Sequence, residues 1–317
     1  MVRKSSCSTL GISPLIPEAL GHHALPLRAS LFTTFLCILF GANAVAIKIS
    51  LTGLGVFTNA GMRFGIAALV IYLWARYTGK PLAVKRNQVH QLVILAMFFF
   101  VQLSLFYFGQ NKTTASHGTL ITNVLPFVVM ILAHYCIPGD TINLRKVSGL
   151  VLGFAGVLVL FFDHTVLTGD ALRGDLFILL AVLVWGCHVV YMKKVIEGFH
   201  PIQVTLYPVS LAAPLFLLSG FLWDGEMVRF IDASIIKAML YQTLVTAAFG
   251  FVAWNTMIQK FGATALHSFV FIMPVSGVFL GVTLLGEPVT ANLICAIVLV
   301  VTGLIVVNRV SRNRLPR

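Results

Sequence analysis

Two basic residues, Lys48 and Arg63, lie in or at the ends of long apolar stretches, and no acidic residue is near them in the sequence. A cation in a membrane-like environment needs a partner or a water-filled cavity, and it is a candidate functional group by default. Together the two would form a cationic patch that attracts a carboxylate or a phosphate. The competing interpretation is that Lys48 snorkels to the membrane surface and Arg63 caps helix carbonyl groups.

The elements that must position these residues are apolar stretches, each about long enough to cross a bilayer as a helix. The connections between them are short, so no soluble domain is inserted. The sequence therefore predicts an all-α integral membrane protein with ten transmembrane helices, over residues 30–51, 57–78, 89–110, 114–135, 145–162, 173–195, 201–223, 234–259, 264–285 and 289–308.

The two halves of the chain repeat one another. Phe40-Gly41 followed by Lys48 corresponds to Trp185-Gly186 followed by Lys193, with the same spacing. Five spans per half is an odd number, so the second half must cross the membrane in the opposite sense, as in the inverted repeats of transporters. The expected organisation is a cytoplasmic tail (1–29), a first five-helix repeat (30–162), an inverted second repeat (173–308) and a basic cytoplasmic tail (309–317).

Polar and aromatic residues inside these stretches are candidates for lining a substrate pathway. Asn43 and His188 are counterparts in the two repeats, as are Tyr107 and Trp254. Asn43 and His188 could serve the two gates of an alternating-access cycle. Tyr107 and Trp254 could line a cavity or seal it. The alternatives are hydrogen bonds between helices for Asn43 and His188, and membrane-interface positions for the two aromatic residues. The further candidates for the pathway are Asn123, Trp185, Asn255 and His267.

Composition favours a membrane protein and excludes several other classes. The chain is 58% hydrophobic and 10% charged, whereas soluble domains carry about 25% charged residues. The net charge of +12 lies in short loops and the tails, so no nucleic-acid partner is expected. The five cysteines have no metal-site or disulfide spacing. There is no nucleophile elbow, P-loop, metal-binding cluster or pair of carboxylates, so neither an enzyme nor a cofactor is expected.

The distribution of Lys and Arg predicts the orientation. With the N-terminus in the cytoplasm, sixteen of the 22 Lys and Arg fall on the inner side and four on the outer side. Both termini are therefore expected in the cytoplasm, in a multi-pass protein of the cell (inner) membrane. No Asp or Glu is expected to be buried deep in a span: Asp175 is placed on the outer side, and Glu287 at the outer end of a span. Residues 1–29 have no apolar core of a cleaved signal peptide.

Several of these residues resemble the drug/metabolite transporter superfamily, and within it the EamA-like family. The matching stretches are 40–48, Arg63-Phe64, Trp185-Gly186, Met273-Pro274 and Gly286 to Thr290. The resemblance covers about 30–308, with Phe40 standing where the family usually has Trp. It implies ten helices in two inverted five-helix halves, a central substrate cavity and export of small metabolites, without fixing the substrate.

The predicted function is export of small organic metabolites, amino acids foremost, by alternating access. Two cations at most suit a single carboxylate better than the several charges of a nucleotide sugar or sugar phosphate, which is the nearest alternative. A drug exporter of the same superfamily is a further alternative, although the embedded Glu that small multidrug exporters use for cationic drugs is missing. A selective channel would need a charged ring or filter loop. The expected partners are a small-molecule substrate and the lipid bilayer, in a monomer or weak homodimer.

Two further roles are predicted for particular residues. Imidazole titrates near physiological pH, so the candidates for proton coupling are His117, His188 and His267. Uncoupled, downhill transport is the alternative. Pro126 and Pro274 leave helix carbonyl groups free and are candidate hinges, although kinks that serve helix packing are their commoner role.

Overall fold

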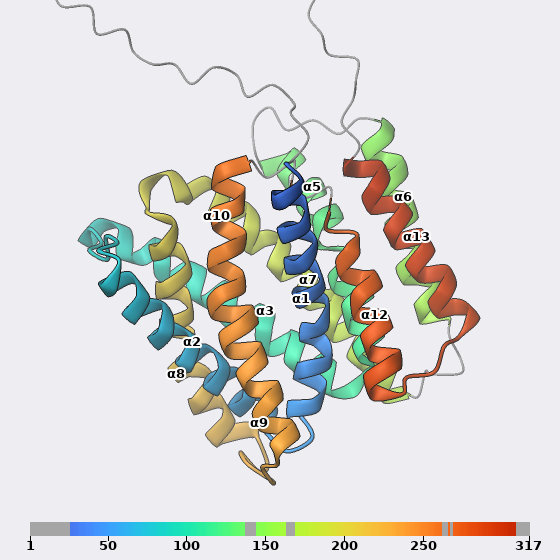
Figure 1. The fold of residues 1–317 in the computed structure, drawn as a ribbon, viewed down its shortest axis with the longest axis horizontal. Coiled ribbons are helices and arrows are strands. Elements are labelled where there is room, and N and C mark those ends of the chain that lie inside the picture. Colours follow the sequence, from blue (N-terminus) through green and yellow to red (C-terminus); the bar gives the residue numbers. More distant parts are fainter. Residues whose placement is uncertain (1–25, 137–143, 163–168, 262–265, 267–268, 309–317) are drawn as a thin grey trace, which may run out of the picture.

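Each of the ten expected apolar stretches contains a helix in the computed structural model, which describes residues 26–136, 144–162, 169–261, 266 and 269–308. Figure 1 shows these helices packed into one bundle. In chain order they are α1 (Leu27–Ser50), α2 (Val56–Tyr77), α3 (Val89–Lys112), α4 (Ala115–Thr122), α5 (Leu125–Cys136), α6 (Leu144–Phe161), α7 (Gly169–Val195), α8 (Pro201–Trp223), α9 (Ala233–Leu240), the π-helical segment η3 (Tyr241–Gly250), α10 (Phe251–Phe261), α12 (Ile272–Leu285) and α13 (Ala291–Asn308).

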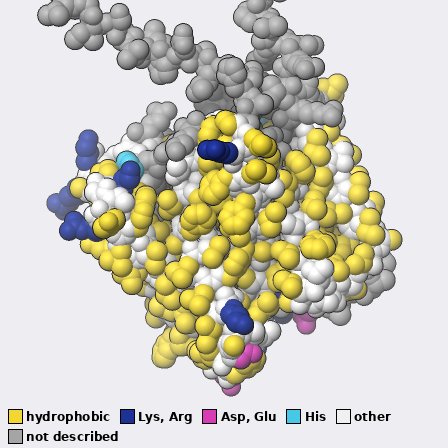
Figure 2. Space-filling model, in the orientation of Figure 1, with side chains coloured by type: hydrophobic (Ala, Val, Ile, Leu, Met, Phe, Trp, Pro, Cys, Tyr) yellow, Lys and Arg dark blue, Asp and Glu magenta, His cyan; other side chains and the backbone are white. Residues whose placement is uncertain are grey.

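The bundle has the composition of a multi-pass membrane protein. Within the described ranges, seven helical segments are long and apolar enough to cross a membrane. The apolar helices Val147–Leu160, Ile272–Leu285 and Ala291–Val307 are shorter. Figure 2 shows apolar side chains over most of the visible face. The all-helical fold is thus confirmed, while the crossing of the membrane by all ten stretches stays a prediction.

The expected span 114–135 is two helices. α4 ends at Thr122, and Asn123 caps it by donating from Nδ2 to the carbonyl oxygen of Thr119 at 2.7 Å. Pro126 is the second residue of α5, and Pro274 is the third residue of α12. Proline in the first turn costs no helical hydrogen bond, because that N–H would have no partner there. Both prolines therefore lie at helix starts rather than at kinks in helix interiors, and their action as hinges stays a prediction.

The expected span 234–259 also departs from a uniform helix. It runs through α9, η3 and α10, and the ten residues of η3 are π-helical. π-helical turns are rare, but those that occur are often at functional sites. Each such turn rotates the side chains after it about the helix axis. This segment supplies two residues of the site described below.

The glycines of the duplicated motif explain how the two halves pack. A Cβ atom on Gly41 would lie 2.7 Å from the carbonyl oxygen of Met273 in α12, and one on Gly186 would lie 2.6 Å from Val128 in α5. Each glycine thus lets the first helix of one half approach the fourth span of the other half closely. The inverted repeat predicts this reciprocal arrangement.

The last helices of the two halves, α6 and α13, also pack against each other. A Cβ atom on Gly149 would lie 2.8 Å from the carbonyl oxygen of Gly303, and one on Gly303 would lie 2.7 Å from that of Gly149. Small residues at such positions let backbones come together in a membrane protein. The helix pairs α2–α8 and α3–α7 likewise join the two halves.

Candidate functional site

Arg63 lies inside the bundle with 4% of its surface exposed. From α2 it donates from one terminal nitrogen to the hydroxyl of Tyr107 in α3 at 3.0 Å, and from the other to the hydroxyl of Thr246 in η3 at 3.2 Å. Its Nε is buried and has no hydrogen-bond partner among the described residues. The guanidinium therefore retains an unused donor.

A second layer of neutral polar groups surrounds these partners. The Tyr107 hydroxyl donates to Gln242 Oε1 at 3.2 Å, and the Thr246 hydroxyl donates to Asn43 Oδ1 at 2.9 Å. Gln242 in turn donates to Asn59 Oδ1 at 3.1 Å and to Ser50 Oγ at 2.9 Å. We call this group the Arg63 cluster; its members are Asn43, Ser50, Asn59, Arg63, Tyr107, Gln242 and Thr246.

Helical spacing brings the cluster together. Asn59 and Arg63 are four residues apart on α2, so they lie on one face of that helix. Asn43 and Ser50, seven apart on α1, also share a face. Thr246 also lies within hydrogen-bond distance of the Gln242 carbonyl one turn before it in η3, at 2.7 Å. The cluster thus collects side chains from α1, α2 and α3 of the first half and from η3 of the second.

The positive charge of Arg63 is not compensated by a negative charge within the cluster. No carboxylate lies within 4.0 Å of Arg63 in the part of the chain that the structure describes, and its bonded partners are neutral hydroxyl groups. The ring of Phe64 lies 4.9 Å from its guanidinium carbon, which adds a cation–π contact. A buried cation without a counter-ion is costly. Such a site would be stabilised by the negative charge of a ligand.

Aromatic rings continue from this cluster along α1 and α10. Phe40 packs against Trp254 at 5.8 Å in an edge-to-face arrangement and against Phe251 at 6.2 Å between ring centroids. All three side chains are half-buried. Phe40 precedes Asn43 by one helical turn, so these rings would offer an apolar surface beside the polar cluster.

His188, the counterpart of Asn43, is buried in a different place. Its Nδ1 lies 3.0 Å from Gln102 Oε1 in α3, and its ring stacks on Phe98 at 6.1 Å. Asn43 and His188 thus each bond a helix of the opposite half. Trp185 is half-buried one turn earlier in α7. The structure does not bring His188 into the Arg63 cluster.

Lys48 lies outside the cluster as well. Its Nζ donates to the carbonyl oxygens of Gln110, Asn111 and Thr113 at the end of α3, at 3.0 Å for Gln110 and 3.3 Å for Asn111. A cation at a helix C-terminus interacts favourably with the helix dipole and with carbonyl groups that lack helical partners. Lys48 therefore caps α3, and its role in a substrate pathway stays a prediction.

His117 has an acidic partner, Asp175, that was not predicted from the sequence. Its Nδ1 lies 2.8 Å from Asp175 Oδ2, and the two side chains are 2% and 0% exposed. The expectation that acidic residues stay out of the interior is thus wrong for Asp175. It lies near the start of an apolar run, which suggested a water-exposed end, but α3 and α4 cover it. Proton coupling through His117 or His188 stays a prediction.

Comparison with known proteins decides the family. The sequence profile described as "EamA-like transporter family" matches the chain twice, at residues 27–162 and 172–309. The chain belongs to the EamA-like transporter family. It is accordingly a multi-pass membrane transporter, and the two matches correspond to the two halves of the repeat.

Relatives of this EamA-like transporter carry general names. "Uncharacterized transporter YoaV" of Bacillus subtilis is 22% identical over 269 residues, covering 84% of this chain and 92% of YoaV. A "Probable amino-acid metabolite efflux pump" of Salmonella typhimurium is 26% identical, covering 84% and 90%. A protein of the same name in Escherichia coli is 25% identical with the same coverage. One crystal structure, 19% identical, shares the fold with a TM-score of 0.66 over 88% of this chain and 96% of the other.

The EamA-like site combines residues predicted from the sequence with others that were not predicted. Asn43, Arg63 and Tyr107 are brought together as members of one cluster. Asn255 has no described side chain, and His267 lies outside the described residues. The missed members are Ser50, Asn59, Gln242 and Thr246. Gln242 and Thr246 could have been noticed, because they are polar residues four positions apart in a mostly apolar stretch.

Proposed function

We propose that this EamA-like transporter exports small organic metabolites that carry one carboxylate, amino acids foremost, and that the Arg63 cluster binds the carboxylate. The observation that carries the proposal is the buried guanidinium with neutral partners and an unused Nε–H. Arginine donors arranged in a plane suit a carboxylate, which accepts two parallel hydrogen bonds. The efflux-pump names of two relatives support the amino-acid class.

The charge of the cluster argues against the alternatives. A nucleotide sugar or a sugar phosphate carries more negative charge and would need several cations, whereas Arg63 is the one cation in the cluster and Lys48 is occupied by carbonyl groups. A cationic drug would need a carboxylate, and the members of the cluster are neutral apart from Arg63. A single anionic group therefore fits best.

The proposed mechanism is alternating access by two inverted five-helix halves, residues 30–162 and 173–308, with ten membrane crossings. The substrate enters from the cytoplasm, and both tails lie on that side of the inner membrane. The Lys and Arg distribution supports this orientation. In Figure 2 the visible Asp and Glu gather at the end of the bundle where α9 begins, which is the outer end in this topology.

Counterflow into liposomes tests the proposal. Purified protein is reconstituted, and uptake of a panel of radiolabelled amino acids is competed with unlabelled amino acids or with the corresponding amides, which lack the carboxylate. We expect amino acids to compete, amides to fail, and Arg63→Met to raise the KM for exchange by about 30-fold or more. Arg76→Met is the matched control, because Arg76 is an exposed arginine on the same helix. Equal competition by amides, or an unchanged KM for exchange in Arg63→Met, would overturn the proposal.

A further inference from the structure

One end of the bundle is held together by carboxylates of the second half that bond the first half. The three residues are Asp175 in α7, Asp224 after α8 and Glu287 after α12, all within the second family match. Their partners lie at the start of α2 and between the end of α3 and the start of α4, within the first match. This is the end at which α2, α4 and α7 begin, which is the outer end in the proposed topology.

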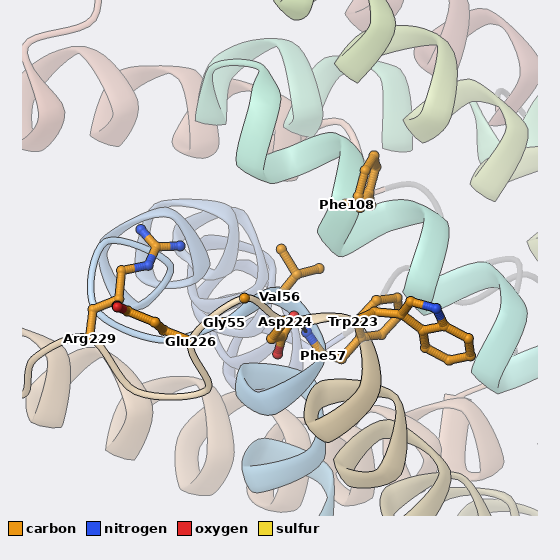
Figure 3. A pocket seen from close by; sticks show the side chains of 9 residues that line it. Gly55, Val56, Phe57, Phe108, Trp223, Asp224, Glu226 and Arg229 are labelled. Carbon is orange, nitrogen blue, oxygen red and sulfur yellow. Dashed lines mark hydrogen bonds between the residues drawn. The ribbon is translucent and has the colours of Figure 1, made fainter.

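Asp224 caps the N-terminus of α2. Its carboxylate accepts from the backbone N–H groups of Phe57 at 3.2 Å and Thr58 at 2.8 Å, and from the Thr58 hydroxyl at 2.8 Å. α2 has no side-chain cap from its own half, because Gly55 stands at the N-cap position. Figure 3 shows Asp224 beside the start of α2, in a cavity of about 630 Å³ that Trp223 also lines.

Glu287 does the same for α4. Its carboxylate accepts from the backbone N–H groups of Ala115, at 2.5 Å, and Ser116, at 2.9 Å, and also from the Ser116 hydroxyl. A carboxylate at a helix N-terminus interacts with the positive end of the helix dipole as well as with these donors. Two helices of the first half thus begin on carboxylates of the second.

Asp175 completes the set from inside the bundle. It accepts from the hydroxyl of Thr113 at 2.5 Å and pairs with His117. Both partners lie within two residues of the donors that hold Glu287. The segment from Thr113 to His117 is therefore held by two carboxylates, from α7 on one side and from the end of α12 on the other.

The opposite end of the bundle is joined differently in the described residues. There Gln88 donates to the carbonyl oxygen of Gly198 at 2.8 Å, and Gln203 to that of Ala83 at 2.6 Å. The Tyr207 hydroxyl donates to a further carbonyl group of the first half. These bonds are neutral, and charge-assisted hydrogen bonds are roughly twice as strong. The halves are thus joined by the stronger type of contact at the carboxylate end.

We propose that Asp175, Asp224 and Glu287 form the latch of the outer gate: their bonds to the starts of α2 and α4 hold the outer side closed and must break for it to open. The inference rests on the alternating access of the proposed function. A bond that only one of two states makes shifts the equilibrium by its own free energy. From the strength of hydrogen bonds to charged groups, we expect the equilibrium to shift ten- to hundredfold toward the open state for each carboxylate that is neutralised.

The test measures the opening of this end directly. Spin labels are placed at Thr52→Cys in the first half and Val289→Cys in the second, both exposed, after the native cysteines are replaced. Their distance distribution is recorded in liposomes for Asp224→Asn, Glu287→Gln and Asp175→Asn. We expect a longer distance to gain population in each variant. Glu226→Gln, an exposed acid in the same cavity as Asp224, should leave the distribution unchanged.

Two results would overturn the latch, and they are distinguishable. If the wild type populates two distances and the three variants do not change their ratio, the latch is wrong while alternating access stands. If the wild type and all variants show one distance and the wild type gives no counterflow, alternating access fails and the latch fails with it. Thermal unfolding of each variant controls for folding. Should buried Asp175→Asn not fold, the partly exposed Asp224 and Glu287 variants still decide the question.

Discussion

Replacing Arg63 by Met should show whether this residue contributes mainly to the stability of the fold or mainly to transport. The substitution keeps an unbranched side chain of similar length but removes the charge and both hydrogen bonds. If Arg63 serves mainly to hold helices together, the variant should lose stability. If it serves to bind an anion, the variant should lose transport and keep its stability.

The structure predicts the second outcome for the free energy of unfolding. Hydrogen bonds to a charged group contribute about 1.5–3 kcal/mol each, so two of them favour the wild type. Against this stand the burial of a cation without a counter-ion, which costs several kcal/mol, and an unpaired Nε–H that costs about 1–3 kcal/mol. Tyr107 and Thr246 each keep another partner in the variant. The net change should lie within about 1 kcal/mol, or favour Arg63→Met.

The expected effect on substrate is much larger. Removing one member of a buried charged pair costs about 2–5 kcal/mol, which corresponds to a loss of affinity of about 30- to 4,000-fold. Thermal unfolding of the purified protein gives the first quantity, and the concentration dependence of counterflow gives the second. A variant that unfolds at a clearly lower temperature while keeping its KM would refute the assignment of Arg63 to the substrate.

Three further changes test the contacts around the site. Gly41→Ala should destabilise the protein by about 1–3 kcal/mol, because the new Cβ meets the backbone of α12. Gly65→Ala should not destabilise it, because its Cβ would make an ordinary contact at 3.8 Å. Thermal unfolding of the two variants tests this difference. Lys48→Met should lower the stability by about 1–2 kcal/mol, because α3 loses its cap, and should leave the KM for exchange unchanged. A raised KM would instead support a role for Lys48 in the substrate pathway. Asp232 caps α9, and the hydrogen bonds from the Ile235 N–H and the Ser234 hydroxyl lower the pKa of its carboxyl group. Its stabilising effect should be complete above the usual aspartate range and be lost as pH falls through the lowered pKa; equal acid sensitivity of Asp232→Asn and wild type in thermal unfolding would contradict this.

The fold was predictable because an apolar stretch of about 20 residues indicates a membrane-spanning helix. The ten apolar stretches each contain a helix, and Gly41 and Gly186, which relate the two halves by their spacing, both lie at close helix contacts. The breaks within spans were harder to foresee. The sequence gives no sign that η3, which packs against α1 and α2, is π-helical.

The site was less predictable, because it depends on contacts between residues far apart in sequence. Arg63 stood out as a lone charge, but its partner Thr246 is 183 positions away. Asp175 was misjudged for the same reason: the sequence shows it near the start of an apolar run, and its burial comes from the tertiary placement of His117 and Thr113. Single polar residues in apolar runs indicate candidates, and packing decides which of them meet.

In the proposed mechanism, the two hydrogen bonds of Arg63 would also link substrate binding to movement of the halves. Tyr107 belongs to the same half as Arg63, whereas Thr246 belongs to the other half. If the halves separate at this level, the bond to Thr246 breaks and the bond to Tyr107 stays. The freed nitrogen would then join the unused Nε–H on the guanidinium, and a carboxylate could accept from both at once. A ligand changes a conformational equilibrium only through a difference in its affinity for the two states. In this cluster the difference would arise because a rocking motion exchanges a bond between the halves for a bond to the substrate.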